Sequence, residues 1–140
     1  MDRKIKHLEF IQETIKRMVG NSFLLRGWSV TLIIAIVTLA HQSDKPIYFV
    51  FAFLINIIFW LLDSYYLLQE KKFRCLYNEV RKKDEALVDF SMSLPEKHCD
   101  DCKWKTSLKS TVFIIFYGIT NLILIAVIVL NYFIITINFK

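Results

Sequence analysis

Glycine and proline are scarce in this chain, which contains 3 Gly and 2 Pro among its 140 residues. This scarcity excludes Gly/Ser-rich and Pro-rich linkers, and also a glycine-rich loop that could cradle phosphates. Internal repeats and low-complexity tracts are absent as well. The sequence therefore predicts a single unit without a clear domain boundary.

Catalytic motifs are also missing. The three histidines, His7, His41 and His98, lie in separate regions and none accompanies a serine or cysteine nucleophile motif. The sequence contains no HExxH motif and no pair of carboxylates inside an apolar run. We therefore expect that the protein is not an enzyme.

Apolar residues are abundant, at 55% of the chain, and they concentrate in three long runs. Each run is near or above the roughly 20 residues that a helix needs to cross a hydrocarbon core of about 30 Å. Backbone amides in lipid must be satisfied within their own element, so the runs should be helices. The predicted fold class is all-α, an integral membrane protein with three transmembrane helices over residues 22–41, 47–68 and 110–137.

The basic residues lie almost entirely on one side of these runs. Six precede or begin the first run and ten lie between the second and third, so sixteen of the 18 Lys and Arg residues share a side. The positive-inside rule then predicts a cytoplasmic N-terminus and an external C-terminus. The net charge of +5 fits contact with anionic lipid headgroups, and no specific nucleic-acid binding is expected.

Two cytoplasmic segments have helical apolar stripes. Residues 1–20 predict an amphipathic helix, and Gly20–Ser22 predict a bend or break before the first span. Residues 69–109 predict a helical stalk and loop, in which the second membrane helix continues to about Ser91 and Pro95 stops it. We expect the two stripes to pack on each other or on neighbouring copies, with attachment of residues 1–20 to the headgroup region as the alternative.

Polar residues at membrane depth are the candidate functional residues. Asp63 and Arg26 lie near the inner ends of two runs, and a charge there must pair or line a wet cavity, so we predict an Arg26–Asp63 pair. Asn56 lies two turns before Asp63 on the same face, and the third run carries Asn121 and Asn131. These amides predict either interhelical hydrogen bonds or a polar pore lining.

A CxxC motif, Cys99 to Cys102, lies between the second and third runs, and a third cysteine, Cys75, lies on the predicted stalk. Two thiolates at this spacing form half of a zinc site, and the other half is missing. We expect reduced cytosolic thiols and no cofactor, and keep zinc at Cys99 and Cys102 as the alternative. A redox role is a further alternative, although no thioredoxin-like pattern surrounds the motif.

The stretches His7–Met18, Asn21–Thr31 and Phe59–Tyr66 resemble a group of small bacterial three-helix inner-membrane proteins without an assigned activity. That group is similar to the small membrane effectors of bacterial anti-phage systems. The resemblance covers most of the chain and implies a protein of the bacterial inner (plasma) membrane, which the Asn-, Ile- and Lys-rich composition also fits. It implies membrane-directed action but supplies no residue roles.

Two functions remain open. The first is an oligomeric channel or membrane-disrupting effector in anti-phage defence, in which cytoplasmic helices gate a pore near Asn56 and Asp63. The second is a non-conducting scaffold or accessory subunit that recruits a cytoplasmic partner. In both cases we expect a lipid bilayer, further copies of the chain, and a cytoplasmic protein or a nucleotide-type ligand as partners.

Overall fold

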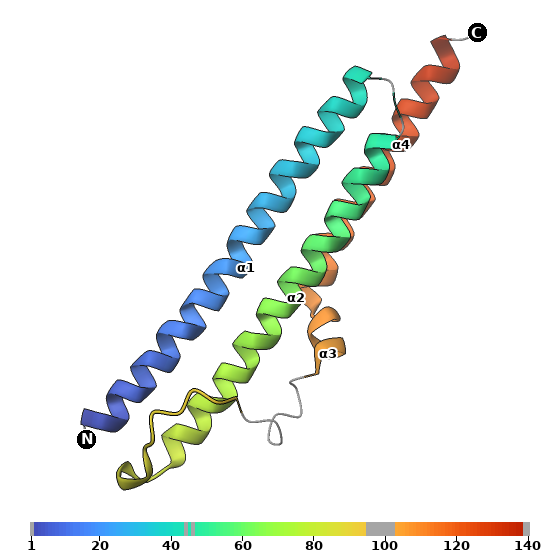
Figure 1. Ribbon diagram of the computed structural model, residues 1–140. Helices are drawn as coiled ribbons and strands as arrows, with labels where there is room; N and C mark the ends of the chain where they lie inside the picture. The colour runs from blue at the N-terminus through green and yellow to red at the C-terminus, as the bar shows by residue number, and fades with distance from the viewer. Residues whose placement is uncertain (1, 44, 46, 95–102, 139–140) are drawn as a thin grey trace. The chain divides into compact units, whose positions relative to one another are not determined.

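The computed structural model describes residues 2–43, 45, 47–94 and 103–138, and the side chains of these residues except 2 and 133–138. Its described part is all-α. The elements are α1 (Asp2–Ser43), α2 (Ile47–Lys82), the 3-10 helix η1 (Glu85–Leu87), α3 (Trp104–Leu108) and α4 (Thr111–Asn138) (Figure 1). Three helices, α1, α2 and α4, are long and apolar enough to cross a membrane, as the sequence predicts.

The chain forms two compact units. Unit 1 comprises Met1–Leu24 and Asp63–Ser107, and unit 2 comprises Leu25–Leu62 and Leu108–Lys140. Unit 2 contains only five charged residues, namely Arg26, Asp44, Lys45, Lys109 and Lys140. The charges of the chain therefore concentrate in unit 1.

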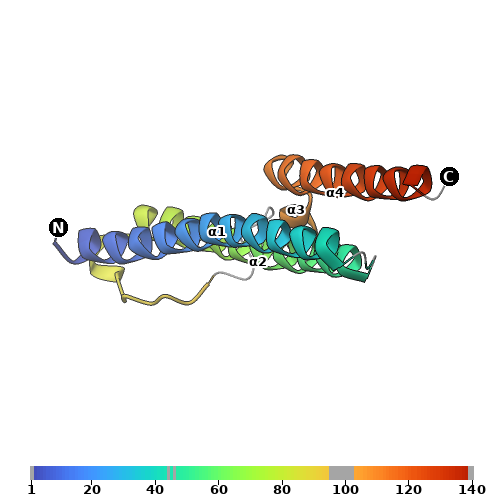
Figure 2. The same ribbon diagram turned by 90° about the horizontal axis from the view of Figure 1, so that it is seen from above.

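In unit 1 the first part of α1 and the last part of α2 lie side by side (Figures 1 and 2). Ile11, Leu76 and Val80 form the buried core, and Leu8, Ile15, Phe73 and Tyr77 pack against it. The predicted contact between the two apolar stripes is therefore confirmed within a single chain. The alternative, in which residues 1–20 lie alone on the membrane surface, would leave this core open.

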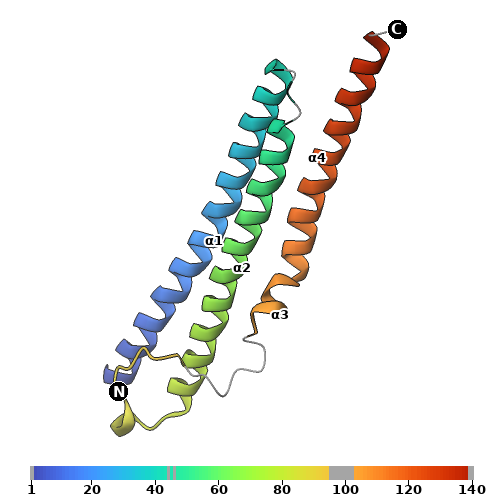
Figure 3. The ribbon, with the colours of Figure 1, turned by 45° about the vertical axis from the view of Figure 1, so that its right-hand side comes forward.

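In unit 2, α4 packs against the parts of α1 and α2 that belong to the same unit (Figure 3). Ile33, Ala52 and Leu124 form a small buried core, and Ile36, Val37 and Ile55 pack against it. Ala52 is fully buried, and its small side chain permits close helix approach. Most large apolar side chains of α4 point outward, as expected for a helix that meets lipid.

The predicted interruption at Gly20–Ser22 is absent, because α1 is one helix of 42 residues. Its length is about 63 Å at 1.5 Å per residue, roughly twice the hydrocarbon thickness. Asn21 and Ser22 are potential capping residues, but a cap forms only where the helix hydrogen bonds end. Here Ser22 is buried and bonds to a side chain of α2.

The second helix ends earlier than expected. Helix α2 stops at Lys82 instead of continuing to about Ser91, and η1 follows. Phe90 then adopts a positive φ of 54°, which is strained for a bulky residue and redirects the backbone. Residues 88–94, here called the strap, return beside α1 (Figure 1, yellow). The centre of the Phe90 ring lies 5.4 Å from the centre of the His7 ring, and this contact stabilises the strained conformation.

Candidate functional site

Asn56 and Asn121 meet inside unit 2. The Asn56 Nδ2 donates a hydrogen bond of 2.9 Å to the Asn121 Oδ1, from α2 to α4. Asn56 is only 1% exposed, and its own Oδ1 is buried without a partner among the described residues. Of the two expectations for these amides, this geometry matches interhelical association.

Asp63 lies in unit 1 and is fully buried. Its carboxylate accepts a hydrogen bond from the Ser22 Oγ of α1. Asn56 and Asp63 are two turns apart on α2, but they bond to different helices. Their spacing in the sequence places both residues on one face of α2. It does not indicate that Asn56 bonds to α4 and Asp63 to α1.

Arg26 belongs to unit 2, where its guanidinium lies 5.1 Å from the centre of the Phe113 ring of α4. This distance is typical of a cation–π contact, which helps a guanidinium to sit beside apolar residues. The predicted Arg26–Asp63 pair stays a prediction. The Phe113 contact was not anticipated, because an aromatic ring in an apolar run gives no sign that it faces a cation.

Asn131 lies near the C-terminal end of α4. Its Nδ2 donates to the backbone oxygen of Val127 at 3.1 Å, and its Oδ1 lies 3.4 Å from the His41 Nδ1 at the end of α1. Asn131 is thus bonded to its own helix and to a neighbouring helix. His41 was not predicted as a partner, because the loop position alone did not indicate which helix it faces.

The CxxC motif, with Cys99 and Cys102, lies outside the described residues, as does His98. Cys75 forms a disulfide bond, which contradicts the expectation of a reduced thiol. That expectation came from the predicted compartment, whereas a disulfide depends on which thiols the fold brings within reach. No cluster of three or more possible metal ligands occurs among the described residues.

His7 is a residue that sequence reasoning missed. It is only 1% exposed, and its Nε2 lies 3.1 Å from the backbone oxygen of Ser91 in the strap. The His7 Nδ1 is buried without a partner in the described part of the chain. His7 lies one turn before Ile11 and so belongs to the apolar stripe. This position was the one sign in the sequence that His7 is buried.

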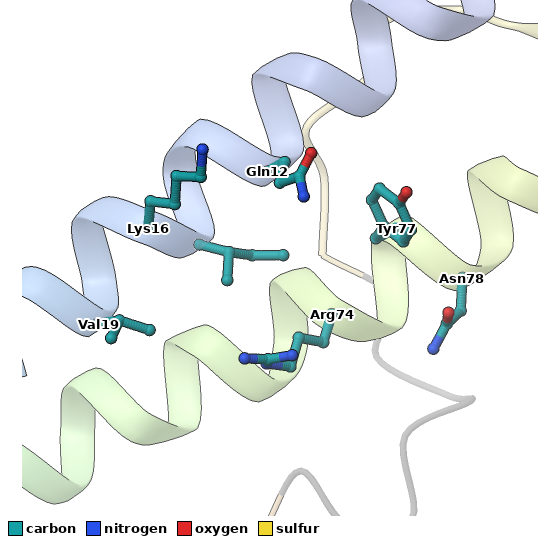
Figure 4. A pocket seen from close by; sticks show the side chains of 7 residues that line it. Gln12, Lys16, Val19, Arg74, Tyr77 and Asn78 are labelled. Carbon is teal, nitrogen blue, oxygen red and sulfur yellow. The ribbon is translucent and has the colours of Figure 1, made fainter.

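A groove of about 570 Å³ lies between α1 and α2 in unit 1 (Figure 4). Two basic side chains, Lys16 and Arg74, line it from opposite helices. Its remaining lining residues are polar or apolar and uncharged: Gln12, Ile15, Val19, Tyr77 and Asn78. We call it the basic groove.

No family model, curated protein or solved structure matches the chain. Its geometry is therefore the basis for any functional assignment. The membrane-compatible helices, the internally bonded amides and the basic groove are the features that carry such an assignment.

Proposed function

We propose that the protein is a non-conducting membrane anchor, a scaffold or accessory subunit whose unit 2 spans a bacterial inner membrane. Unit 1 then presents its charged surface to a cytoplasmic partner. The observation that carries the proposal is the burial of Asn56 and Asp63 inside their own chain.

A pore built from several copies needs polar groups that face a shared axis. The two best candidates on α2 form hydrogen bonds within the chain instead, Asn56 with Asn121 and Asp63 with Ser22. Turning either residue toward such an axis would break its bond, which is costly in an apolar environment. This geometry favours a structural role for both residues.

The outward surface of α4 gives a second argument. Its exposed large side chains between Val112 and Leu130 are apolar, among them Ile115, Ile119 and Leu122. A channel lined by such residues would not hold water, so copies that associate through α4 would form a dry contact. The surface therefore suits lipid or a second apolar helix.

Ion flux from reconstituted vesicles tests the proposal against the channel hypothesis. We expect full-length protein to release no more dye or ions than empty vesicles, with a pore-forming peptide as the positive control. Asn56→Leu should leave this result unchanged. Flux from the wild type that falls in Asn56→Leu would overturn the proposal and favour the anti-phage channel or effector.

The recruiting role needs its own measurement. A photo-crosslinking residue at Phe10, which is 53% exposed on unit 1, should form adducts with a second protein in cells. The same residue at Ile115, on the outward face of α4, is the matched control and should not. Adducts only between copies of this chain would contradict recruitment.

A further inference from the structure

The side chains that line the basic groove offer many hydrogen-bond donors. Lys16 offers an ammonium, Arg74 a guanidinium, Gln12 and Asn78 offer amide N–H groups, and Tyr77 a hydroxyl. No carboxylate is among its lining residues, all of which lie in the described part of the chain. Such a set can surround an anion with several donors.

One cation of the groove is held in position. The Arg74 Nε donates to the Glu70 Oε1 one turn earlier at 2.7 Å. Glu70 thereby orients the guanidinium of Arg74, whose side chain is 60% exposed, while the two terminal amino groups keep their donors. An arginine oriented in this way can offer two parallel hydrogen bonds, the geometry that carboxylate and phosphate groups match.

The wall of the groove rests on the buried core of unit 1. Tyr77 and Ile15 pack against the buried core of unit 1, so their positions depend on Ile11, Leu76 and Val80. Figure 4 shows Lys16 and Gln12 on one helix and Arg74, Tyr77 and Asn78 on the other. The donors thus come from two helices that their own core holds together.

The groove lies at a defined distance from the apolar runs. Val19 and Lys16 precede the first predicted span, residues 22–41, by three and six residues, or about 5 and 9 Å along a helix. Arg74 follows Leu68, the end of the second run, by six residues, or about 9 Å. A headgroup layer adds about 5–7 Å beyond the hydrocarbon on each side, so in a chain that spans a bilayer the near end of the groove would lie beside that layer.

We propose that the basic groove binds a phosphate ester with a net negative charge. Two sources share this chemistry: the headgroup of an anionic phospholipid, which the adjoining bilayer supplies, and a soluble phosphorylated molecule. The proposal does not depend on the non-conducting role, because a channel subunit could carry the same groove.

Native mass spectrometry of the full-length protein in a phosphate-free neutral detergent tests the site. The probes are phosphatidylglycerol, zwitterionic phosphatidylcholine and glycerol 3-phosphate. We expect phosphatidylglycerol to bind more tightly than phosphatidylcholine. The double variant Lys16→Gln/Arg74→Gln should weaken phosphatidylglycerol binding about tenfold, because two cations act together on one anion.

The matched control is Lys6→Gln/Arg81→Gln, which removes two exposed cations of the same helices outside the groove. It should bind like the wild type. The isosteric Gln12→Glu keeps the shape of the groove and adds a carboxylate, and it should also abolish the preference. This second variant keeps the test valid if the double variant folds poorly.

The outcomes separate the sources. Tight phosphatidylglycerol binding that glycerol 3-phosphate does not displace would support the lipid headgroup, and displacement would support a soluble phosphate ester. No preference for either anionic probe over phosphatidylcholine would overturn the proposal. Equal losses in the groove variant and its control would also overturn it, since net charge alone would then explain binding.

Discussion

Asn56 is buried and donates its hydrogen bond to Asn121 of a neighbouring helix, and a buried amide without such a bond is costly. Asn56→Ala and Asn121→Ala should each lower the free energy of unfolding by about 1–2 kcal/mol. Because each removes the same bond, the double variant should lose less than the sum, with a coupling energy of about 1 kcal/mol. Unfolding in mixed micelles measures these changes.

Thr120 provides the control for this cycle. It neighbours Asn121, but its hydroxyl bonds to the backbone oxygen of Phe116 in the same helix. Asn56→Ala and Thr120→Ala should therefore add without coupling. Additive losses for Asn56 and Asn121 themselves would show that their bond contributes nothing to stability.

The disulfide at Cys75 predicts how this residue reacts with thiol reagents. In protein purified without reductant, a thiol reagent should modify Cys75 only after reduction, because a disulfide sulfur is not a nucleophile. Peptide mass mapping before and after reduction measures this. Modification of Cys75 without reductant would restore the expectation of a free thiol that its predicted compartment suggested.

The candidate residues themselves were visible in the sequence, because a polar side chain in an apolar run stands out. Their partners were not. The spacing of Asn56 and Asp63 fixes one face of α2, but only the rotation of the neighbouring helices decides that Asn121 and Ser22 face them. His7 was hidden for a related reason, since its role depends on a strap that returns from residues 88–94.

At the scale of the elements, α1 shows why a local stop signal failed. Its inward face repeats every eleven residues in steps of four, three and four, and it continues through Gly20 without a change of phase. An eleven-residue repeat matches the natural turn of a nearly straight helix. The buried or half-buried residues of this face are His7, Ile11, Thr14, Met18, Ser22, Leu25, Ser29, Ile33, Ile36 and Ala40.

Substitution of Gly20 tests whether α1 is continuous at this position. A Cβ built on Gly20 meets nothing within 4 Å, and its backbone is helical. Gly20→Ala should therefore raise the free energy of unfolding by about 0.5–1 kcal/mol, because alanine loses less conformational entropy in a helix. Chemical or thermal unfolding in detergent measures this change.

Gly27→Ala is the companion variant, since Gly27 is helical and equally open. It should change stability in the same direction. A loss of stability in Gly20→Ala alone would indicate that α1 bends or breaks there after all, as the residues Gly20–Ser22 first suggested.

The strap should respond to pH through Asp89. The Ser91 backbone N–H donates to the Asp89 carboxylate at 3.2 Å and lowers the pKa of Asp89, with smaller effects from Lys83 and His7. A lowered pKa stabilises the folded strap above the ordinary pKa of aspartate, near 3.9, and this contribution disappears as pH falls through the lowered value. The protection of the amides of residues 88–94 against hydrogen exchange, relative to their intrinsic exchange rates, should therefore fall below about pH 4.

Asp89→Asn should remove this pH dependence while the neutral-pH structure persists. Asp84→Asn is the control, because Asp84 precedes η1 without a side-chain capping bond, and it should keep the dependence. An unchanged acid response in Asp89→Asn would assign the effect to other groups beside the strap.

At the scale of the whole molecule, charge and hydropathy divide between the two units. Unit 2 carries five charged residues, and fourteen of the 18 Lys and Arg residues belong to unit 1. Three helices can span a bilayer by length and composition, and three crossings would put the chain ends on opposite sides. The basic excess then predicts that unit 1 faces the cytoplasm.

Reporter fusions test this topology. A reporter active only in the cytoplasm should work after Leu94 and fail at Lys140, whereas one active only outside should do the reverse. Adding basic residues to the short connection between α1 and α2, for example Gln42→Lys with Ser43→Lys, should weaken the bias, because this connection now holds only Lys45 as a cation. The isosteric control Gln42→Glu should leave the orientation unchanged, since acidic residues contribute little to it. Cytoplasmic activity at Lys140 in the unaltered chain would contradict the three-span topology and the cytoplasmic partner that we propose for unit 1.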